Sequence, residues 1–212
     1  MAPVDTVQIT AEPEGRILEA AEQLFAERGF TGAGVDEIAH RAGVNKAMLY
    51  YHIGDKAALY RAVLTRNIER MRQSIQAAVR PADEPSEQLR AIIATFFSVF
   101  GANPAFPQIM LRELATGGAN LPAEIVGMMA TVFGTTRQVL KDGHAEGEFR
   151  AVNPLMTHLL VVGSCFVLMN AGRLHARMVE LGLQPAEIPT SPEAVAKGVA
   201  DLILHGVSRK RT

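Results

Sequence analysis

The feature that most constrains the fold is the spacing of apolar residues, which follows the 3.6-residue period of an α-helix along most of the chain. From Pro13 onward, for example, Ile17, Ala21 and Leu24 recur on one face, while Glu19 and Gln23 face away. No segment alternates apolar and polar residues with the period of two that a half-buried strand shows. We therefore predict an all-α fold of about nine helices and no sheet.

Proline and glycine divide this helical pattern into parts. The clearest linker lies at 81–85, where two prolines flank a short polar segment. We expect a disordered tail at 1–12, a small helical domain at 13–60, a connecting helix at 61–80 and a larger helical domain at 86–208.

Composition and motifs argue against several classes of protein. Hydrophobic residues make up 48% of the chain and charged residues 20%, as in an ordinary globular protein. The single cysteine, Cys165, lies in an apolar run and is expected to be a buried, reduced thiol. The chain has no Gly-x-Ser-x-Gly, P-loop or His-Glu-x-x-His motif, and its six histidines lack zinc-ligand spacing. We expect no enzyme activity, no cofactor and no metal.

Targeting and membrane segments are also not expected. Residues 1–13 lack the basic and apolar regions of a secretory signal. The longest apolar run, 155–169, is interrupted by Thr157, His158 and Ser164 and is shorter than the roughly 20 residues of a membrane-spanning helix. We expect a cytoplasmic protein without a membrane partner.

Charge is unevenly distributed along the N-terminal part of the chain. The net charge is −1. Residues 1–40 carry two basic and eight acidic side chains, a balance of −6, and residues 41–80 carry eight basic and two acidic ones, a balance of +6. Segment 41–80 is therefore a candidate surface for phosphates, although a solvated helix face accounts for the same pattern equally well.

Two short helices within this region have the spacing of a helix-turn-helix. The first is predicted at about 35–42 and ends at Gly43, which can adopt the left-handed conformation that the turn needs. The second begins behind Asn45, a residue that favours the N-cap position. The side chains expected to face DNA lie on this second helix and just after it: Asn45, Lys46, Ala47, Met48, Tyr50, Tyr51, His52 and Lys56.

The segment from about Gly15 to Leu64 resembles the signature of the TetR family of transcriptional regulators. A Gly-Val turn leads into a short helix, followed by Leu49-Tyr50-Tyr51-His52 and by a lysine two residues after Gly54. The resemblance implies that Lys46, Ala47 and Met48 approach bases, while Tyr50, His52 and Lys56 hold the DNA backbone. Gly32 and Gly34 depart from the pattern, because relatives place a capping Thr or Ser there, and Ile53 replaces the usual Phe.

The C-terminal half resembles this family more loosely, in its helix number and in the turn at 146–154. The resemblance implies a pocket for an apolar effector among these helices. We predict that it is lined by Phe96, Phe100, Met110, Met129, Phe133, Phe166 and Met169. A stripe of Met and Phe at helical spacing also fits plain core, and His158, Asn170 and His175 are polar candidates on the same helix as Phe166.

Assembly is predicted from the last two long helices, which begin at Pro154 and Pro192. The first is apolar almost all round near its middle, and the second carries a narrow apolar stripe that includes Leu202. We expect these helices to pair in a homodimer. The predicted function is a TetR-like repressor that binds a palindromic double-stranded DNA operator under control of a small, largely apolar effector. The alternatives are a helical dimeric adaptor without DNA binding and, least favoured, an enzyme.

Overall fold

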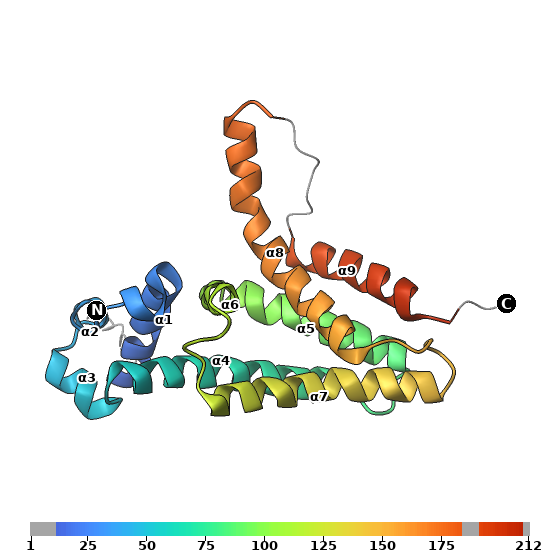
Figure 1. Cartoon of the computed structure of the whole chain (residues 1–212), viewed down its shortest axis with the longest axis horizontal. Helices are drawn as coiled ribbons and strands as arrows, with labels where there is room; N and C mark the ends of the chain where they lie inside the picture. Colours follow the sequence, from blue (N-terminus) through green and yellow to red (C-terminus); the bar gives the residue numbers. More distant parts are fainter. Residues whose placement is uncertain (1–11, 184–190, 210–212) are drawn as a thin grey trace, which may run out of the picture. The chain divides into compact units, whose positions relative to one another are not determined.

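The computed structural model describes residues 12–183 and 191–209, and within them the chain forms nine α-helices (Figure 1). The described residues contain no strand, only an isolated bridge between Phe149 and Ser208. The predicted all-α fold is therefore confirmed. The expected N-terminal tail lies, apart from Glu12, outside the described residues.

The helix boundaries agree with the sequence pattern to within a few residues. The helices are α1 Pro13–Gly32, α2 Val35–Ala42, α3 Lys46–His52, α4 Lys56–Ala78, α5 Pro85–Ala102, α6 Ala105–Ala115, α7 Ala123–Ala145, α8 Pro154–Glu180 and α9 Pro192–Val207. Helix α1 is interrupted at Gly29. Its φ of 72° breaks the regular helix there, but one further turn follows before α1 ends.

Side-chain caps explain why several helices begin where they do. Asn45, Asp55, Asn153 and Ser191 each accept a hydrogen bond from the backbone N–H three residues later, at 2.7–3.1 Å. A cap of this kind satisfies one of the four N–H groups that a helix start leaves unpaired, and it contributes about 1 kcal/mol. The local sequence therefore determines these four starting points.

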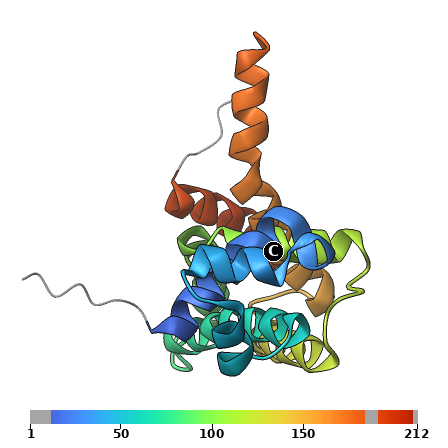
Figure 2. The same ribbon diagram turned by 90° about the vertical axis from the view of Figure 1, so that its left-hand side faces the viewer.

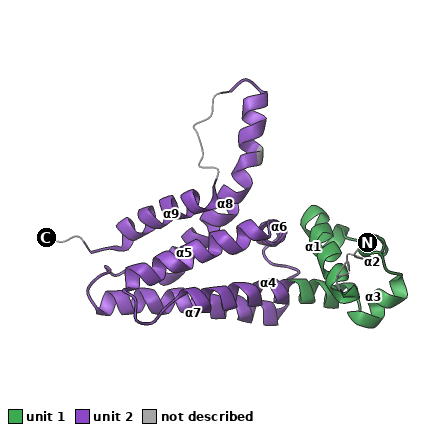
Figure 3. Cartoon of the chain, turned by 180° about the vertical axis from the view of Figure 1, so that it is seen from behind, with its two compact units in different colours: residues 1–63 green, residues 64–212 purple. Residues whose placement is uncertain are grey.

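The chain separates into two compact units, residues 1–63 and 64–212 (Figure 3). The division falls inside α4, within the segment 61–80 that was expected to connect the two domains. Most of that segment belongs to the second unit, because Ile68, Met71 and Ile75 of α4 are buried in its core.

The first unit has an aliphatic and aromatic core. Ile17, Phe25, Ile38 and Leu49, contributed by α1, α2 and α3, are completely buried. The ring of Phe25 meets that of Tyr60 edge-on, with centroids 4.8 Å apart. These contacts attach α2 and α3 to α1 and to the first turns of α4.

The second unit is organised around α5, which packs against α7, α8 and α9. One side of α5 is aromatic. The ring of Phe100 lies 5.7 Å from that of Phe96 on the same helix and stacks at 5.4 Å on Phe166 of α8. A row of rings therefore joins α5 to α8.

The turn between α7 and α8 closes over the end of α9. Phe149 in this turn is completely buried. The backbone N–H of Arg150 donates to the carbonyl of Val207, and that of Arg209 donates to the carbonyl of Glu148, both at 2.9 Å. These two bonds fix the C-terminal end of α9 to the start of α8.

Helix α8 is more exposed than the sequence predicted. Its 27 residues make it, within the described part of the chain, the single unbroken helix whose length and composition would allow it to cross a membrane. The apolar run at 155–169 is only part of this helix, which continues past it to Glu180. Its C-terminal half extends beyond the other helices of the second unit (Figure 1 and Figure 2). Its N-terminal half packs one face on α5 and α7, as core helices of soluble proteins do.

Close packing at Gly143 gives a stability prediction. A Cβ built on this residue would lie 2.9 Å from Cβ of Pro85 and closer still to the ring of Phe149. We expect Gly143→Ala to lower the free energy of unfolding by about 1–3 kcal/mol through overpacking. Gly134 is the matched control, because it also lies within α7 but has no atom within 4 Å of its added Cβ.

At Gly134 the same substitution should be neutral or stabilise by up to about 1 kcal/mol, since alanine loses less backbone entropy on folding. Urea unfolding followed by circular dichroism measures both variants. Equal stabilities of the two variants would contradict the close packing at Gly143.

Candidate nucleic-acid interface

The turn between α2 and α3 has the conformation that the sequence predicted. Gly43 lies in the left-handed region, with φ 66° and ψ 35°. Its N–H and that of Val44 donate to the carbonyls of His40 and Ala39, both at 3.1 Å, and so close the end of α2. A residue with a Cβ is strained at this φ, which explains the glycine.

Helix α3 presents almost all of its side chains to solvent. Only Leu49 is buried, and it anchors the helix to the core of the first unit. The other predicted DNA-facing residues on or next to it are exposed: Asn45, Lys46, Ala47, Met48, Tyr50, Tyr51 and His52. Tyr51 is the most exposed of the large side chains, at 86%. Contact of these residues with DNA stays a prediction.

Lys46 has an acidic neighbour that the sequence analysis did not identify. Its Nζ lies 2.7 Å from Oδ1 of Asp36 on α2, and both side chains are more than half exposed. The hydrogen bond with Asp36, and then its negative charge, raise the pKa of Lys46. Residues ten apart on two different helices have no signature in the sequence pattern. Any DNA group that contacts Lys46 must compete with this carboxylate.

Lys56 also has a role within the protein. Its Nζ donates to the carbonyl of Thr31 at 3.1 Å and lies 4.9 Å from the centroid of the Phe30 ring. It therefore satisfies a carbonyl in the last turn of α1. An ammonium group has three donors, so the predicted phosphate contact of Lys56 remains compatible with this geometry.

The start of α2 differs from the family pattern as the sequence indicated. Its N-cap residue is Gly34, so α2 has no side-chain cap.

An exposed ion-pair network joins α1 to α2. Arg41 contacts Glu27 and Glu37, each at 2.9 Å, and Arg28 donates to the same Glu37. The hydrogen bond with Arg41 lowers the pKa of Glu27, and Glu27 and Glu37 together raise that of Arg41. Arg41 is thus paired within the protein, as Lys46 is with Asp36, so the +6 balance of residues 41–80 overstates the charge available to phosphates.

The second unit contains an apolar cavity where the sequence predicted an effector pocket. The cavity measures about 70 Å³. Five of the seven predicted residues line it: Phe96, Phe100, Met110, Met129 and Phe166. Phe133 and Met169 do not; the methyl group of Met169 lies instead about 3.5 Å from the position of a Cβ built on Gly101. Of the polar candidates, His158 lines the cavity, whereas Asn170 and His175 do not. The lining residues that the prediction omitted are Ile68, Met71, Phe106, Val132 and Val162.

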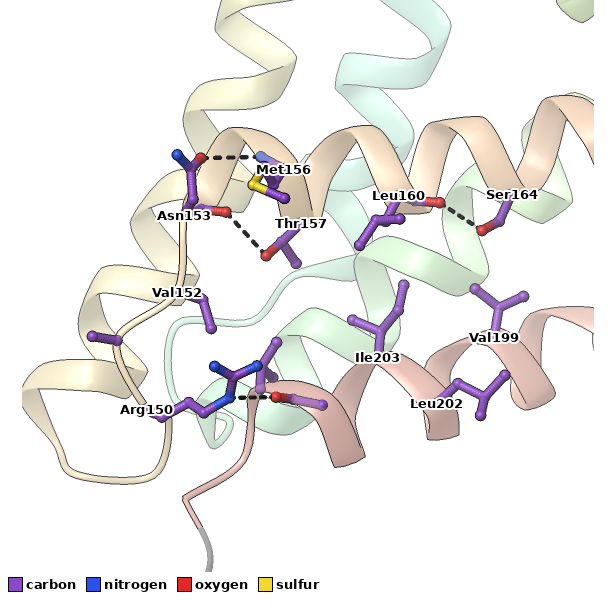
Figure 4. Close-up of a pocket in the computed structure, with 13 residues that line it drawn as sticks. Arg150, Val152, Asn153, Met156, Thr157, Leu160, Ser164, Val199, Leu202 and Ile203 are labelled. Carbon is purple, nitrogen blue, oxygen red and sulfur yellow. Dashed lines mark hydrogen bonds between the residues drawn. The ribbon is translucent and has the colours of Figure 1, made fainter.

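A second, larger hollow of about 560 Å³ lies between α8 and α9 (Figure 4). Leu160 and Thr157 of α8 and Val199, Leu202 and Ile203 of α9 line it. Arg150 closes one end, where its Nε donates to the carbonyl of Gly206 at 2.6 Å. Several apolar side chains around the hollow are well exposed, among them Leu160 at 60% and Leu202 at 77%.

Comparison with protein families matches both parts of the chain. Residues 17–63 match the family described as bacterial regulatory proteins, tetR family. Residues 85–191 match the tetracyclin repressor-like C-terminal domain. Together these ranges include the turn, α3 and the cavity-lining helices α5 to α8.

Two curated relatives are transcription regulators. The HTH-type transcriptional repressor NicS of Pseudomonas putida is 26% identical over 195 residues, which cover 91% of each chain. The HTH-type transcriptional activator FasR of Mycolicibacterium smegmatis is 42% identical over 86 residues, and the match spans 41% of this chain and 39% of that protein. The relatives thus include both a repressor and an activator.

Solved structures share the fold over nearly the whole chain. The ketosteroid transcriptional regulator KstR2 of Mycobacterium tuberculosis has a TM-score of 0.74 and 22% identity, and the alignment covers 95% of this chain and 97% of that one. A tetR-family regulatory protein from Rhodococcus RHA1 has a TM-score of 0.76 and 18% identity, and the alignment covers 95% of this chain and 100% of that one. Similarity at this level of identity concerns the fold alone.

The Lys46–Asp36 pair generates a prediction about duplex affinity. Asp36→Asn removes the carboxylate that competes for Lys46. Because an exposed ion pair is worth about 0.2–1 kcal/mol, we expect affinity for a mixed-sequence 40-base-pair duplex to rise by about 1.5- to 5-fold at low salt. Fluorescence anisotropy with a labelled duplex measures this change.

Asp142→Asn on α7 is the control, because it changes the net charge equally without altering the pair. An equal rise in both variants would show that net charge, and not release of Lys46, is responsible.

Proposed function

Because this chain belongs to the TetR family of bacterial regulatory proteins, we propose that it acts as a homodimeric repressor of a palindromic operator, controlled by a small, largely apolar effector. The family consists of non-enzymatic helix-turn-helix transcription regulators that bind DNA operators and effector ligands, and this chain is one of them. The relative matched over 91% of both chains is a repressor, which supports that mode of action here. Such a regulator is expected to act in the cytoplasm.

The observation that carries the proposal is the combination of a rigid attachment and an exposed face in α3. Gly43 sets its direction, Asn45 caps its start and buried Leu49 fixes its rotation. Its other side chains remain exposed, and those of Lys46, Tyr50 and His52 carry hydrogen-bonding groups. An α-helix presented in this way fits the major groove of B-DNA, where every base pair has a distinct donor and acceptor pattern.

Salt dependence tests the proposed DNA contacts. We expect the logarithm of the association constant for a 40-base-pair duplex to fall linearly with the logarithm of salt concentration, with a slope of about −0.9 per neutralised phosphate. Lys56→Ala removes a predicted phosphate contact and should reduce the magnitude of this slope by about one. Binding that does not change between low and physiological salt would contradict a phosphate-based interface.

Dimerisation is supported by the exposed apolar surface of α8 and α9. Leu155, Leu159 and Leu160 of α8 and Leu202 of α9 are each at least half exposed in the single chain. We call these leucines and the hollow between the two helices the α8–α9 patch; Leu160 and Leu202 line the hollow. Exposed apolar surface of this kind usually marks an interaction site. A twofold axis across this patch would place it against the same patch of a second copy, so that each copy buries the apolar side chains of the other.

The dimer prediction is tested by Leu202→Glu. An unpaired charge buried in the interface costs several kcal/mol, so this variant should sediment as a monomer at concentrations where the wild type is a dimer. Leu114→Glu on α6 is the matched control, because Leu114 is also well exposed, at 61%, but lies outside the patch. A Leu202→Glu variant that remains dimeric would reject this interface.

The apolar cavity supports effector binding, on the condition that side chains move to enlarge it. Pockets for small molecules measure about 300–1,000 Å³, and this cavity is only about 70 Å³. A ligand must therefore displace the flexible side chains of Met71, Met110 or Met129, which suit such rearrangement. Met71 lies on α4, the helix that also carries Lys56. We propose that displacement of α4 couples effector binding to operator affinity. This coupling requires that the effector binds the DNA-competent and the DNA-incompetent states of the protein with different affinities.

A further inference from the structure

The cavity contains one polar side chain, that of His158. The other ten residues that line it are aliphatic, aromatic or methionine. His158 itself is 9% exposed. Its ring lies edge-on to Phe96 at 5.7 Å and to Phe133 at 5.3 Å between centroids. The imidazole is therefore held between two aromatic rings at the wall of an otherwise apolar space.

The hydrogen bond of His158 to Thr136 determines which ring nitrogen carries the proton. Nδ1 lies 3.0 Å from Oγ1 of Thr136, which is completely buried. The hydroxyl of Thr136 has no other hydrogen-bond partner among the described residues. Its single proton is satisfied only if the hydroxyl donates to Nδ1. Nδ1 is then the acceptor, and the proton of the neutral imidazole resides on Nε2.

The Nε2–H group has no hydrogen-bond partner within the described part of the protein. No buried side-chain nitrogen or oxygen of that part lacks a partner, so Nε2 is accessible to a small molecule. Because His158 lines the cavity, an acceptor atom of a ligand bound there can take the hydrogen bond of this donor.

We propose that the Nε2–H of His158 anchors the effector, and that the effector is a neutral, largely apolar molecule with one hydrogen-bond acceptor oxygen, such as a ketone. The inference rests on the proposed effector site in this cavity and specifies its chemistry. Nothing in the comparisons assigns a ligand to this residue.

The charges around the cavity favour a neutral ligand over a carboxylate. No lysine or arginine lines the cavity. Burial lowers the pKa of His158 from 6.5 to about 4, so the ring is uncharged at physiological pH. A carboxylate in this space would lose its hydration without gaining a counter-charge. Arg137 is exposed and lies against the Phe133 ring, with its guanidinium carbon 6.0 Å from the centroid, and it does not line the cavity.

Three small probes with nine heavy atoms each test the proposal: acetophenone, isopropylbenzene and benzoate. They share a benzene ring and differ in the substituent, which is a ketone, an isosteric hydrocarbon or a carboxylate. Binding to the full chain is followed by NMR of the methionine methyl groups. Met110 and Met129 line the cavity and should shift, whereas Met48 on α3 and Met156 beside the α8–α9 hollow should not.

The measured quantity is the ratio of the dissociation constant of isopropylbenzene to that of acetophenone. Loss of the anchoring hydrogen bond in His158→Phe should lower this ratio by at least about fivefold relative to the wild type. His175→Phe is the matched control, since it makes the same substitution on α8 outside the cavity lining and should leave the ratio unchanged. Benzoate should bind the wild type at least about tenfold more weakly than acetophenone.

A measurement on the wild type does not depend on the folding of any variant. The ¹⁵N shifts of His158 should report a neutral ring protonated at Nε2, and the Nε2 signal should move when acetophenone binds. A proton on Nδ1, or a ratio unchanged in His158→Phe, would overturn the anchor while leaving the effector cavity intact. If no probe shifts Met110 and Met129, the cavity is not a ligand site, and the effector part of the proposed function fails with it. DNA binding is measured separately and is not affected by either result.

Discussion

The burial of α5 is the interaction on which the second unit depends. Six large apolar side chains of this helix are almost completely removed from water: Leu89, Ile92, Ile93, Phe96, Phe97 and Phe100. Burying each of them contributes about 1.5–3 kcal/mol, and α7, α8 and α9 obtain much of their own burial against this helix. The cavity lies where Phe96 and Phe100 meet α8 and packing is incomplete. The candidate effector site is thus a gap in the same core that stabilises the unit.

In the first unit, α3 is held in place although nearly all of its surface is exposed to water. One buried leucine, one glycine turn and one side-chain cap achieve this attachment. The exposed face carries little charge of its own apart from Lys46, which Asp36 partly neutralises. This arrangement keeps non-specific attraction to phosphates moderate, so that discrimination between sequences must come from contacts with base edges.

Features that depend on local sequence were predictable. The helix starts at Asn45 and Ser191 and the left-handed Gly43 follow from the preferences of single residues, and the TetR family was recognisable from the segment around them. Features that depend on packing between distant segments were not. The Lys46–Asp36 pair, the contribution of Ile68 and Met71 to the cavity and the position of Met169 outside it all require the tertiary structure. The exposed face of α8 was only partly predictable, since an apolar helix surface looks the same in sequence whether its own chain or a partner covers it.

In the proposed homodimer, two copies of α3 read a symmetric operator. Selection of binding sites by the purified chain from a library of random duplexes shows whether they do. We expect enrichment of an inverted repeat whose half-site centres are separated by about a whole number of 10-base-pair turns. Enrichment of no sequence, or of a single asymmetric site bound by one copy, would contradict it.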